Sequence, residues 1–247
     1  MRARLDIEMV RRGLAKSRET ARRLIMAGRV RVNSRPADKP DLLVSAESSV
    51  TVLGSDPQYA SRGAYKLIAA LDAFAVEVAG RHALDVGAST GGFTDVLLKR
   101  GAAHVIALDV GYGQIAERLR TDPRVTILDR TNVRLVQPRT LPYLPDLATI
   151  DTSFISLRIV IPAVLALLAA KAEIIALVKP QFEVGRGQVG KGGIVRDEAV
   201  RRTALEGILS FARQAGLEIV GSIDSPIAGA RGNREFLVVM KFAHPGK

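Results

Sequence analysis

The sequence predicts an α/β protein in which a small α+β domain precedes a doubly wound, mostly parallel sheet. From residue 82 onward, apolar runs of strand length alternate with helix-like segments, and this alternation is typical of parallel sheets covered by helices. Residues 1–35 hold 11 Lys and Arg against 3 Asp and Glu, so they carry +8 of the chain's net charge of +11. Between these parts, GSDPQYASRG has the Gly, Ser, Asp and Pro content of a linker. We therefore expect domains over 1–55 and 64–247, joined by a linker over 56–63.

The composition narrows the classes of function. A chain of 247 residues with no cysteine forms no disulfide and no cysteine–zinc site, and its three histidines show no metal-ligand spacing. The N-terminus lacks the apolar segment of a signal peptide, and the longest apolar run, residues 159–170, is too short to span a bilayer. A pI near 10.4 is typical of proteins that bind nucleic acid or an anionic membrane surface. We expect a cytoplasmic protein that binds no metal and does not insert into membranes.

The first domain is predicted to contain two short helices and a β-ribbon. RLDIEMVRRGL has apolar residues at helical spacing and ends at Gly13, and Ser17 is placed to cap a second helix that ends at Gly28. Two short strands, 30–33 and 48–53, follow and are expected to pair. Arginines on one face of the second helix, beside such a ribbon, suit a phosphate backbone. The simpler alternative is a solvated basic face.

The frame RLD…RRGLAKSRETARRLIMAGRVRVN, within residues 3–55, resembles the S4 RNA-binding domain. The chain departs from the frame at Ser34, where that domain commonly has glycine. The resemblance implies that the domain binds structured RNA by its shape and its phosphates. The residues that it implies as RNA contacts are Arg4, Arg12, Lys16, Ser17, Arg18, Arg22, Arg29 and Arg62.

The second domain is predicted as a succession of strands and helices. The expected strands are HALDVGA, HVIALDV, 125–128, 147–151, 172–179, 217–223 and 235–242, and the expected helices are 94–101, 113–120, 157–170 and 197–214, with a further helix around Lys66. The short connection between the last two strands predicts an antiparallel hairpin at the end of the sheet. The strand that ends at Lys179 is rich in Ile and Val without polar alternation, which is typical of a central strand.

A glycine-rich turn, GASTGGF, follows the first of these strands. Ligands of doubly wound sheets bind at the carboxyl ends of strands, and Gly87, Gly91 and Gly92 allow a ligand to approach the backbone closely. Asp109 ends the next strand, 22 residues after Gly87, where a carboxylate can accept hydrogen bonds from ribose hydroxyls. The spacing G-x-x-x-G-G differs from that of dinucleotide enzymes. The pattern indicates a nucleoside-bearing cofactor, and the alternative is a structural turn in another Rossmann-like protein.

DVGASTGGFTDVLL and VIALDVG together resemble motif I and the following strand of S-adenosylmethionine-dependent methyltransferases, which have the Rossmann-like class I fold. The resemblance implies S-adenosyl-L-methionine as the cofactor, with the glycine turn around its methionine portion and Asp109 on its ribose. Asn132, or in its place Asp129, would face the adenine. The implied cofactor residues are Asp85, Gly87, Ala88, Ser89, Gly91, Gly92, Phe93, Asp109, Asn132 and Asp151.

Four charged residues are expected at the same edge of the sheet. Asp151 and Lys179 close two strands, Glu235 begins the last, antiparallel strand, and Lys66 lies on the helix that leads into the domain. This order resembles the catalytic Lys-Asp-Lys-Glu tetrad of the FtsJ-like RNA 2′-O-methyltransferases. With an S4 domain in front, and with SRGAYKL, IDTSFISL, LVKPQFE and GNREFL, the chain resembles the TlyA family. That resemblance implies methylation of cytidine 2′-hydroxyls in ribosomal RNA, with ribosomal RNA or ribosomal subunits as the partner.

The role of Lys179 is open at the level of sequence. A free lysine is protonated at neutral pH; a neighbouring lysine and partial burial favour the neutral base, whereas Asp151 and Glu235 favour the cation. Lys179 is therefore either the base that takes the hydroxyl proton or the cation that positions the hydroxyl. Two other functions stay as alternatives: a membrane-active haemolysin, a name that also accompanies the family, and a ribosomal RNA-binding assembly factor without catalysis.

Overall fold

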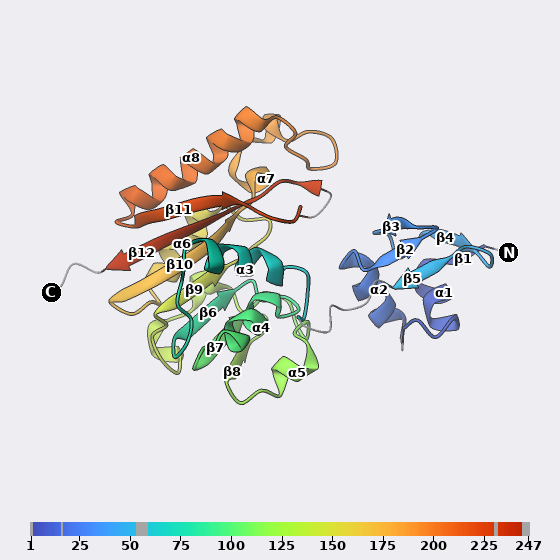
Figure 1. Cartoon of the computed structure of the whole chain (residues 1–247), viewed down its shortest axis with the longest axis horizontal. Coiled ribbons are helices and arrows are strands. Elements are labelled where there is room, and N and C mark those ends of the chain that lie inside the picture. The colour runs from blue at the N-terminus through green and yellow to red at the C-terminus, as the bar shows by residue number, and fades with distance from the viewer. Residues whose placement is uncertain (1, 16, 53–58, 230–231, 244–247) are drawn as a thin grey trace. The chain divides into compact units, whose positions relative to one another are not determined.

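The computed structural model of the chain divides into two compact units, Met1–Ser61 and Arg62–Lys247 (Figure 1). It describes residues 2–15, 17–52, 59–229 and 232–243. Lys16 and residues 56–58 of the expected linker therefore lie outside the described residues. Each unit has a hydrophobic core of its own.

In its described residues, the N-terminal unit has two short helices and five three-residue strands. Its elements are β1 (Arg2–Arg4), α1 (Leu5–Arg11), α2 (Arg18–Met26), β2 (Val30–Val32), β3 (Arg35–Ala37), β4 (Leu43–Ser45) and β5 (Val50–Val52). The two helices pack together over a core that includes Leu5, Met9 and Ile25, all fully buried. As the sequence predicts, Ser17 caps α2, because its hydroxyl accepts a hydrogen bond from the Thr20 N–H at 3.2 Å.

The expected ribbon is present and has one more strand than the sequence predicted. β2 pairs antiparallel with β5, which confirms the pairing of 30–33 with 48–53, and it also pairs with β3 on its other side. Asn33 and Ser34, with φ of 47° and 66°, form the two-residue turn from β2 to β3. β1 and β4 form a separate two-stranded sheet. β1 (RAR), β3 (RPA) and β4 (LVS) lack the Val-x-Val alternation that indicated β2 and β5, so they were not predicted.

The C-terminal unit is built on one seven-stranded sheet with the order β11-β12-β10-β9-β6-β7-β8. Its strands are β6 (His82–Val86), β7 (His104–Leu108), β8 (Val125–Leu128), β9 (Leu147–Ile150), β10 (Lys171–Val178), β11 (Glu218–Asp224) and β12 (Phe236–Ala243). The five strands from β10 to β8 run parallel, whereas β12 is antiparallel to both β10 and β11. The predicted doubly wound, mostly parallel sheet is thus confirmed, and its last hairpin inserts β12 between β10 and the edge strand β11.

Helices cover both faces of this sheet (Figure 1). They are α3 (Ala64–Ala73), α4 (Gly92–Lys99), α5 (Glu117–Arg120), α6 (Leu157–Leu165), α7 (Pro180–Glu183) and α8 (Glu198–Gln214), with the short 3-10 turns η1 (Val133–Leu135), η2 (Pro138–Thr140) and η3 (Arg186–Gln188). α3 and α4 pack together, and so do α6 and α8. The largest core lies between the sheet and the α6–α8 pair, where alternate side chains of the central strands are buried.

Two helices are shorter than predicted, and one was not predicted. The segment 111–116 bends instead of starting a helix, because Gly113 has a φ of +62°, outside the helical region. α6 ends at Leu165 rather than at residue 170, since β10 begins at Lys171 and a connection is needed between them. Pro180, which ends β10, also starts the one-turn helix α7, a position that its fixed φ favours.

Candidate active site

The register of the central strands brings three charged residues to one edge of the sheet. Val86 of β6 pairs with Ile150 of β9, so both strands end together, and β10 continues beside them to Val178. Asp151 therefore follows the end of β9, and Lys179 follows the end of β10. In the antiparallel pair, Val178 lies opposite Phe236, so Glu235, one residue before β12, arrives at the same edge.

Lys179 and Asp151 form an ion pair at this edge. The Lys179 Nζ lies 2.6 Å from Asp151 Oδ1 and donates a hydrogen bond to the Ser153 hydroxyl at 3.0 Å. The lysine side chain is 9% exposed and the aspartate side chain 24% exposed, so the pair is reached from solvent through Asp151. Ser153 stood inside the quoted motif IDTSFISL, but nothing in its spacing indicated that it would contact Lys179.

Lys66 and Glu235 form a second and more deeply buried ion pair. The Lys66 Nζ lies 2.5 Å from Glu235 Oε2, and the two side chains are 9% and 2% exposed. Residues 169 positions apart in sequence meet here because α3 packs against β12. Gly229 closes the other side of the carboxylate, since a Cβ at Gly229 would lie 1.9 Å from Glu235 Oε1. The structure thus resolves the four expected residues into two pairs, each joining one lysine to one carboxylate.

The glycine turn after β6 packs directly on the residue that holds Lys179. Gly87 has a φ of +87°, and a Cβ on it would lie 2.5 Å from the Asp151 backbone oxygen. Gly91 has a φ of +90° and begins α4 with no room for a side chain against Leu119. Both glycines are therefore required by the backbone itself, and Gly87 also sets the distance between the turn and Asp151.

Asp109, at the end of β7, is bound to the same turn. Its carboxylate accepts hydrogen bonds from the Ser89 N–H at 2.8 Å and from the Gly111 N–H at 2.7 Å, and the residue remains partly exposed. The Ser89 hydroxyl in turn contacts Gln114 Oε1 at 3.2 Å. A turn rich in backbone N–H groups, with a carboxylate at its rim, suits a ligand that carries both hydroxyl and carboxylate groups. Gln114 and Gly111 were not singled out from the sequence.

Asp85 and Phe93 lie behind the turn rather than in it. Asp85 is completely buried, and its carboxylate accepts hydrogen bonds from the Thr94 hydroxyl at 2.7 Å and the Thr149 hydroxyl at 2.9 Å. Burial raises the pKa of Asp85 to about 6, although the two hydroxyls oppose the shift. Phe93 is 4% exposed in α4. These two residues are placed to support the turn, whereas Ser89 and Asp109 are placed to meet a ligand.

Asn132 and Asp129 both lie in the segment that follows β8. The Asn132 side chain caps η1 by accepting from the Arg134 N–H at 3.1 Å. The Asp129 carboxylate accepts from the Gly113 N–H at 3.0 Å. Both side chains are partly buried, but only Asp129 connects this segment to the loop that follows Asp109.

A carboxylate in α7 holds the loop between Asp151 and α6. Glu183 accepts hydrogen bonds from the Ser156 hydroxyl at 2.6 Å and from the Leu157 N–H at 2.8 Å, at the first turn of α6. Burial raises the pKa of Glu183. Phe154, in the same loop, is 91% exposed with a φ of +63°, and its ring lies 5.2 Å from that of Phe182. The segment that carries Lys179 is thus joined to the segment that carries Asp151 at several points.

The basic residues of the N-terminal unit have different environments. Arg12 is turned inward: its guanidinium donates to Glu8 at 2.6 Å and to the backbone oxygens of Ser48, Ser45 and Ala46 at 2.6, 3.0 and 3.0 Å. Its side chain is 23% exposed. This arginine joins α1 to the turn between β4 and β5.

The other expected RNA contacts are more accessible. Arg4 and Arg18 are paired with Asp6 and are 42% and 57% exposed, whereas Arg29 is half-buried. Ser17 and Arg22 are exposed in the N-terminal unit, and Arg62 is exposed just before α3 in the C-terminal unit. Arg18 and Arg22 both line a hollow of about 440 Å³ on α2.

Two further observations concern the described part of the chain only. None of its helices is both long enough and apolar enough to cross a membrane. Its His, Asp and Glu side chains also include no group of three placed to hold a metal ion.

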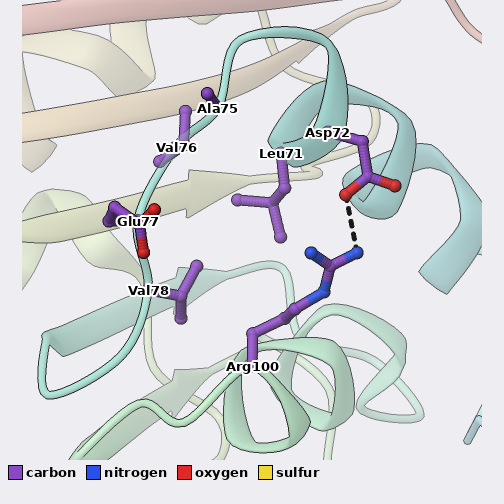
Figure 2. A pocket seen from close by; sticks show the side chains of 7 residues that line it. All are labelled: Leu71, Asp72, Ala75, Val76, Glu77, Val78 and Arg100. Carbon is purple, nitrogen blue, oxygen red and sulfur yellow. Dashed lines mark hydrogen bonds and ion pairs between the residues drawn. The ribbon is translucent and has the colours of Figure 1, made fainter.

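A second hollow, of about 280 Å³, lies where α3 ends (Figure 2). Arg100, just after α4, reaches Asp72 on α3 at 2.7 Å across one side of it, and the loop 75–78 forms the other side. Since α4 starts at the carboxyl end of β6 and runs back along it, this hollow lies at the opposite edge of the sheet from Lys179.

A glycine turn at the switch point of a doubly wound sheet, with an acid at the end of the next strand, is typical of a Rossmann-like domain that binds a nucleoside-bearing ligand. The chain belongs to the FtsJ-like methyltransferase family, which matches residues 59–242, and it carries an S4 domain, which matches residues 3–50.

Three similar proteins illustrate the range of relatives. The chain is 52% identical, over 97% of its length and 90% of the relative's, to a Mycobacterium tuberculosis protein named 16S/23S rRNA (cytidine-2'-O)-methyltransferase TlyA. A solved structure from Streptococcus thermophilus that carries the name hemolysin has a TM-score of 0.77 and 40% identity, over 98% of this chain and 89% of that one. An S-adenosylmethionine-dependent methyltransferase from Listeria monocytogenes has a TM-score of 0.54 and 16% identity, over 71% and 97% of the two chains, and shows likeness of fold alone.

Proposed function

We propose that this protein transfers a methyl group from S-adenosyl-L-methionine to the 2′-hydroxyl of a cytidine in ribosomal RNA, and that its S4 domain docks the RNA. The observation that carries the proposal is the pair of lysine–carboxylate contacts, Lys179–Asp151 and Lys66–Glu235, at one edge of the sheet, where Asp151 packs against Gly87 of the glycine turn. The named activity of the M. tuberculosis relative supports the choice of ribosomal RNA and of cytidine. A ribosomal RNA substrate would also place the protein in the cytoplasm.

The residues of the turn suit S-adenosylmethionine. Gly87 and Gly91 have the positive φ values and the missing side chains of a backbone cradle, and Asp109 offers a partly exposed carboxylate at its rim. Ser89 and Gln114 would line the cradle, and Asp85 would hold it from below through Thr94. When bound there, S-adenosylmethionine supplies a methyl group on a positively charged sulfur.

The two ion pairs would orient the hydroxyl that receives the methyl group. Each lysine is held by its own carboxylate at 2.6 Å or less, a geometry that stabilises an ammonium group in each pair. Of the two roles that the sequence left open for Lys179, this pairing favours the positioning cation. Its Nζ would donate a hydrogen bond to the 2′-oxygen and direct a lone pair of that oxygen toward the methyl group, so that positioning supplies much of the rate. The hydroxyl proton would leave through the exposed Asp151 side to water.

The decisive experiment incubates the purified protein with methyl-labelled S-adenosylmethionine and isolated ribosomal subunits of both sizes. We expect label on a ribose 2′-oxygen of cytidine, mapped by nuclease digestion and mass spectrometry. Label on a base would contradict the assignment of the hydroxyl as acceptor. Binding of the subunits without uptake of S-adenosylmethionine, measured by calorimetry, would instead favour the non-catalytic assembly factor.

A further inference from the structure

Asp6 is a fully buried carboxylate that joins two exposed arginines of the N-terminal unit. Arg4 donates to it from two nitrogens, Nε to Oδ1 at 3.1 Å and Nη2 to Oδ2 at 3.2 Å. Arg18 donates from Nη2 to the same Oδ2 at 3.1 Å. The Ile7 N–H also donates a hydrogen bond to Oδ1, at 3.0 Å. Asp6 itself is 0% exposed, so solvent and ligands reach only the arginines around it.

The two arginines come from different elements and would otherwise move independently. Arg4 ends β1, and Arg18 is the first residue of α2. Holding a long side chain in one direction costs conformational entropy, which a ligand must supply if the protein does not. Here Asp6 fixes both guanidinium groups on one oxygen, and each keeps part of its five N–H donors for other partners.

Both arginines of this pair are exposed to solvent rather than buried in the core. The arginine side chains are 42% and 57% exposed. Arg18 also borders the hollow on α2. The residues that line this hollow are Arg18, Glu19, Arg22, Arg23 and Met26. The pair therefore lies at one end of a basic surface on which a phosphate backbone could continue.

We infer that Asp6 is a positioning residue for RNA binding, which presents Arg4 and Arg18 together to one phosphate group of the RNA backbone. The inference rests on the proposed docking of RNA by the S4 domain. Two guanidinium nitrogens held on one carboxylate oxygen are spaced to meet the two free oxygens of a phosphate. The arginines also lower the pKa of Asp6, through their hydrogen bonds first, so the carboxylate stays charged and keeps its hold.

Two explanations predict opposite changes in RNA affinity for Asp6→Asn: an effect of net charge alone, and a positioning role of Asp6. Asp6→Asn removes a negative charge from a surface that binds a polyanion. If net charge alone governed the interaction, RNA would bind more tightly. If Asp6 positions the arginines, RNA should bind about tenfold more weakly, because a charge-assisted contact is lost. The slope of binding against salt should also become shallower by about one phosphate contact.

The experiment measures binding of the full-length chain to isolated ribosomal subunits over a range of salt concentrations. Asp38→Asn is the matched control, because it removes the same charge from an exposed position of the same unit and should leave binding unchanged or slightly tighter. Asp6→Asn is also combined with Arg4→Ala and Arg18→Ala. In that background both arginine side chains that Asp6 positions are absent, so Asp6→Asn should no longer weaken RNA binding.

The outcomes separate the inference from the proposed function. Unchanged or tighter binding by Asp6→Asn in the otherwise native chain would overturn the inference alone. So would an equal weakening in both backgrounds, since that is the result expected if Asp6 only stabilises the fold. If Arg4→Ala with Arg18→Ala leaves RNA binding unchanged, the proposed docking surface fails as well.

Discussion

Two buried carboxylates, one in each unit of this protein, have pKa shifts of opposite direction. In the C-terminal unit, Asp85 is surrounded by hydroxyls, and burial raises its pKa to about 6. In the N-terminal unit, Glu8 is equally hidden, yet hydrogen bonds from Arg11 and then Arg12 lower its pKa to about 2. The comparison shows that burial alone does not decide the charge of a carboxylate; the presence of a cation does.

The paired cations of the two units differ in how far they are exposed to solvent. Lys66 and Lys179 are held inside the C-terminal unit with side chains only 9% exposed. Arg4 and Arg18, held by Asp6, keep about half of their surface in solvent. A carboxylate thus holds a cation at a sheltered edge of the sheet in one unit, and at an exposed surface in the other.

The largest effect should come from removing the sheltered cation. Lys179→Ala should lower the rate of methyl transfer by about 100- to 10,000-fold, since a positioned polar group at the reacting atoms is lost. Its effect on S-adenosylmethionine binding, measured by calorimetry, should stay within about a few-fold. Lys171→Ala is the matched control, because Lys171 is exposed at the other end of the same strand. Full activity of Lys179→Ala would remove this residue from the mechanism.

The contact between the glycine turn and Asp151 should show the next largest effect. Gly87→Ala places a Cβ against the Asp151 backbone, so we expect cofactor affinity to fall on the order of tenfold and activity to fall with it. Gly80→Ala is the control for backbone strain without a steric clash. Its φ is also positive, at +74°, but no atom lies within 4 Å of the added Cβ. Gly80→Ala should lose about 1–2 kcal/mol of stability from its positive φ alone, and Gly87→Ala should lose more because its Cβ also collides with the Asp151 backbone. Equal loss of cofactor binding in both would mean that Asp151 is not involved.

Within the N-terminal unit, two arginines should separate into different tasks. Arg22→Ala should weaken RNA binding by several-fold, and should make its salt dependence shallower by about one contact, without changing the melting temperature. Arg12→Ala should instead lower the stability of the unit by about 1–3 kcal/mol, because the backbone oxygens of the β4–β5 turn lose their donor. Melting curves and salt titrations of the two variants test this directly. A shallower salt slope for Arg12→Ala would place that residue at the RNA.

The smallest expected effect is on the pH dependence of stability, to which Asp85 and Glu8 should contribute in opposite directions. The folded state binds the Asp85 proton more tightly than the unfolded state, so the contribution of Asp85 to stability declines as pH rises from about 4 through 6. Asp85→Asn should therefore gain stability relative to the native chain over that window.

Glu8 should behave in the reverse way. Its contribution is complete above its ordinary pKa of 4.5 and is lost as pH falls through about 2. Glu8→Gln should accordingly be destabilised at pH 6, and this difference should shrink as pH falls from about 4.5 to about 2. Urea unfolding at several pH values measures both variants. If Asp85→Asn and Glu8→Gln changed the free energy of unfolding in the same direction at the same pH, the comparison between these two carboxylates would be wrong.

Much of the architecture could be predicted because local patterns agree with the fold. The alternation of strands and helices gave the doubly wound sheet, and Ser17 capped α2 as expected. The strands β1, β3 and β4 were missed because they lack the Val-x-Val alternation of the equally short β2 and β5. α7 was missed because Pro180 was interpreted only as the end of a strand.

The sequence predicted that Asp151 and Lys179 would lie at one edge of the sheet, but not how the lysines and carboxylates pair. Parallel strands end at one edge, so Asp151 and Lys179 were expected together. No sequence pattern indicates that Lys66 pairs with Glu235, or that Ser153 contacts Lys179, since these contacts depend on how α3 and a loop pack. Glu183 was missed for the same reason: its partners are the first residues of a helix from another part of the chain.

The sequence by itself determined the kind of fold, the glycine turn with its acid 22 residues later, and the concentration of positive charge in the first 35 residues. These features depend on residue type and on spacing along the chain. Only the tertiary structure decided which charge meets which: Lys179 with Asp151, Arg12 with backbone oxygens, and Arg18 with Asp6. The reason is physical, because an ion pair or a hydrogen bond depends on distances of about 3 Å that strand register and helix packing set.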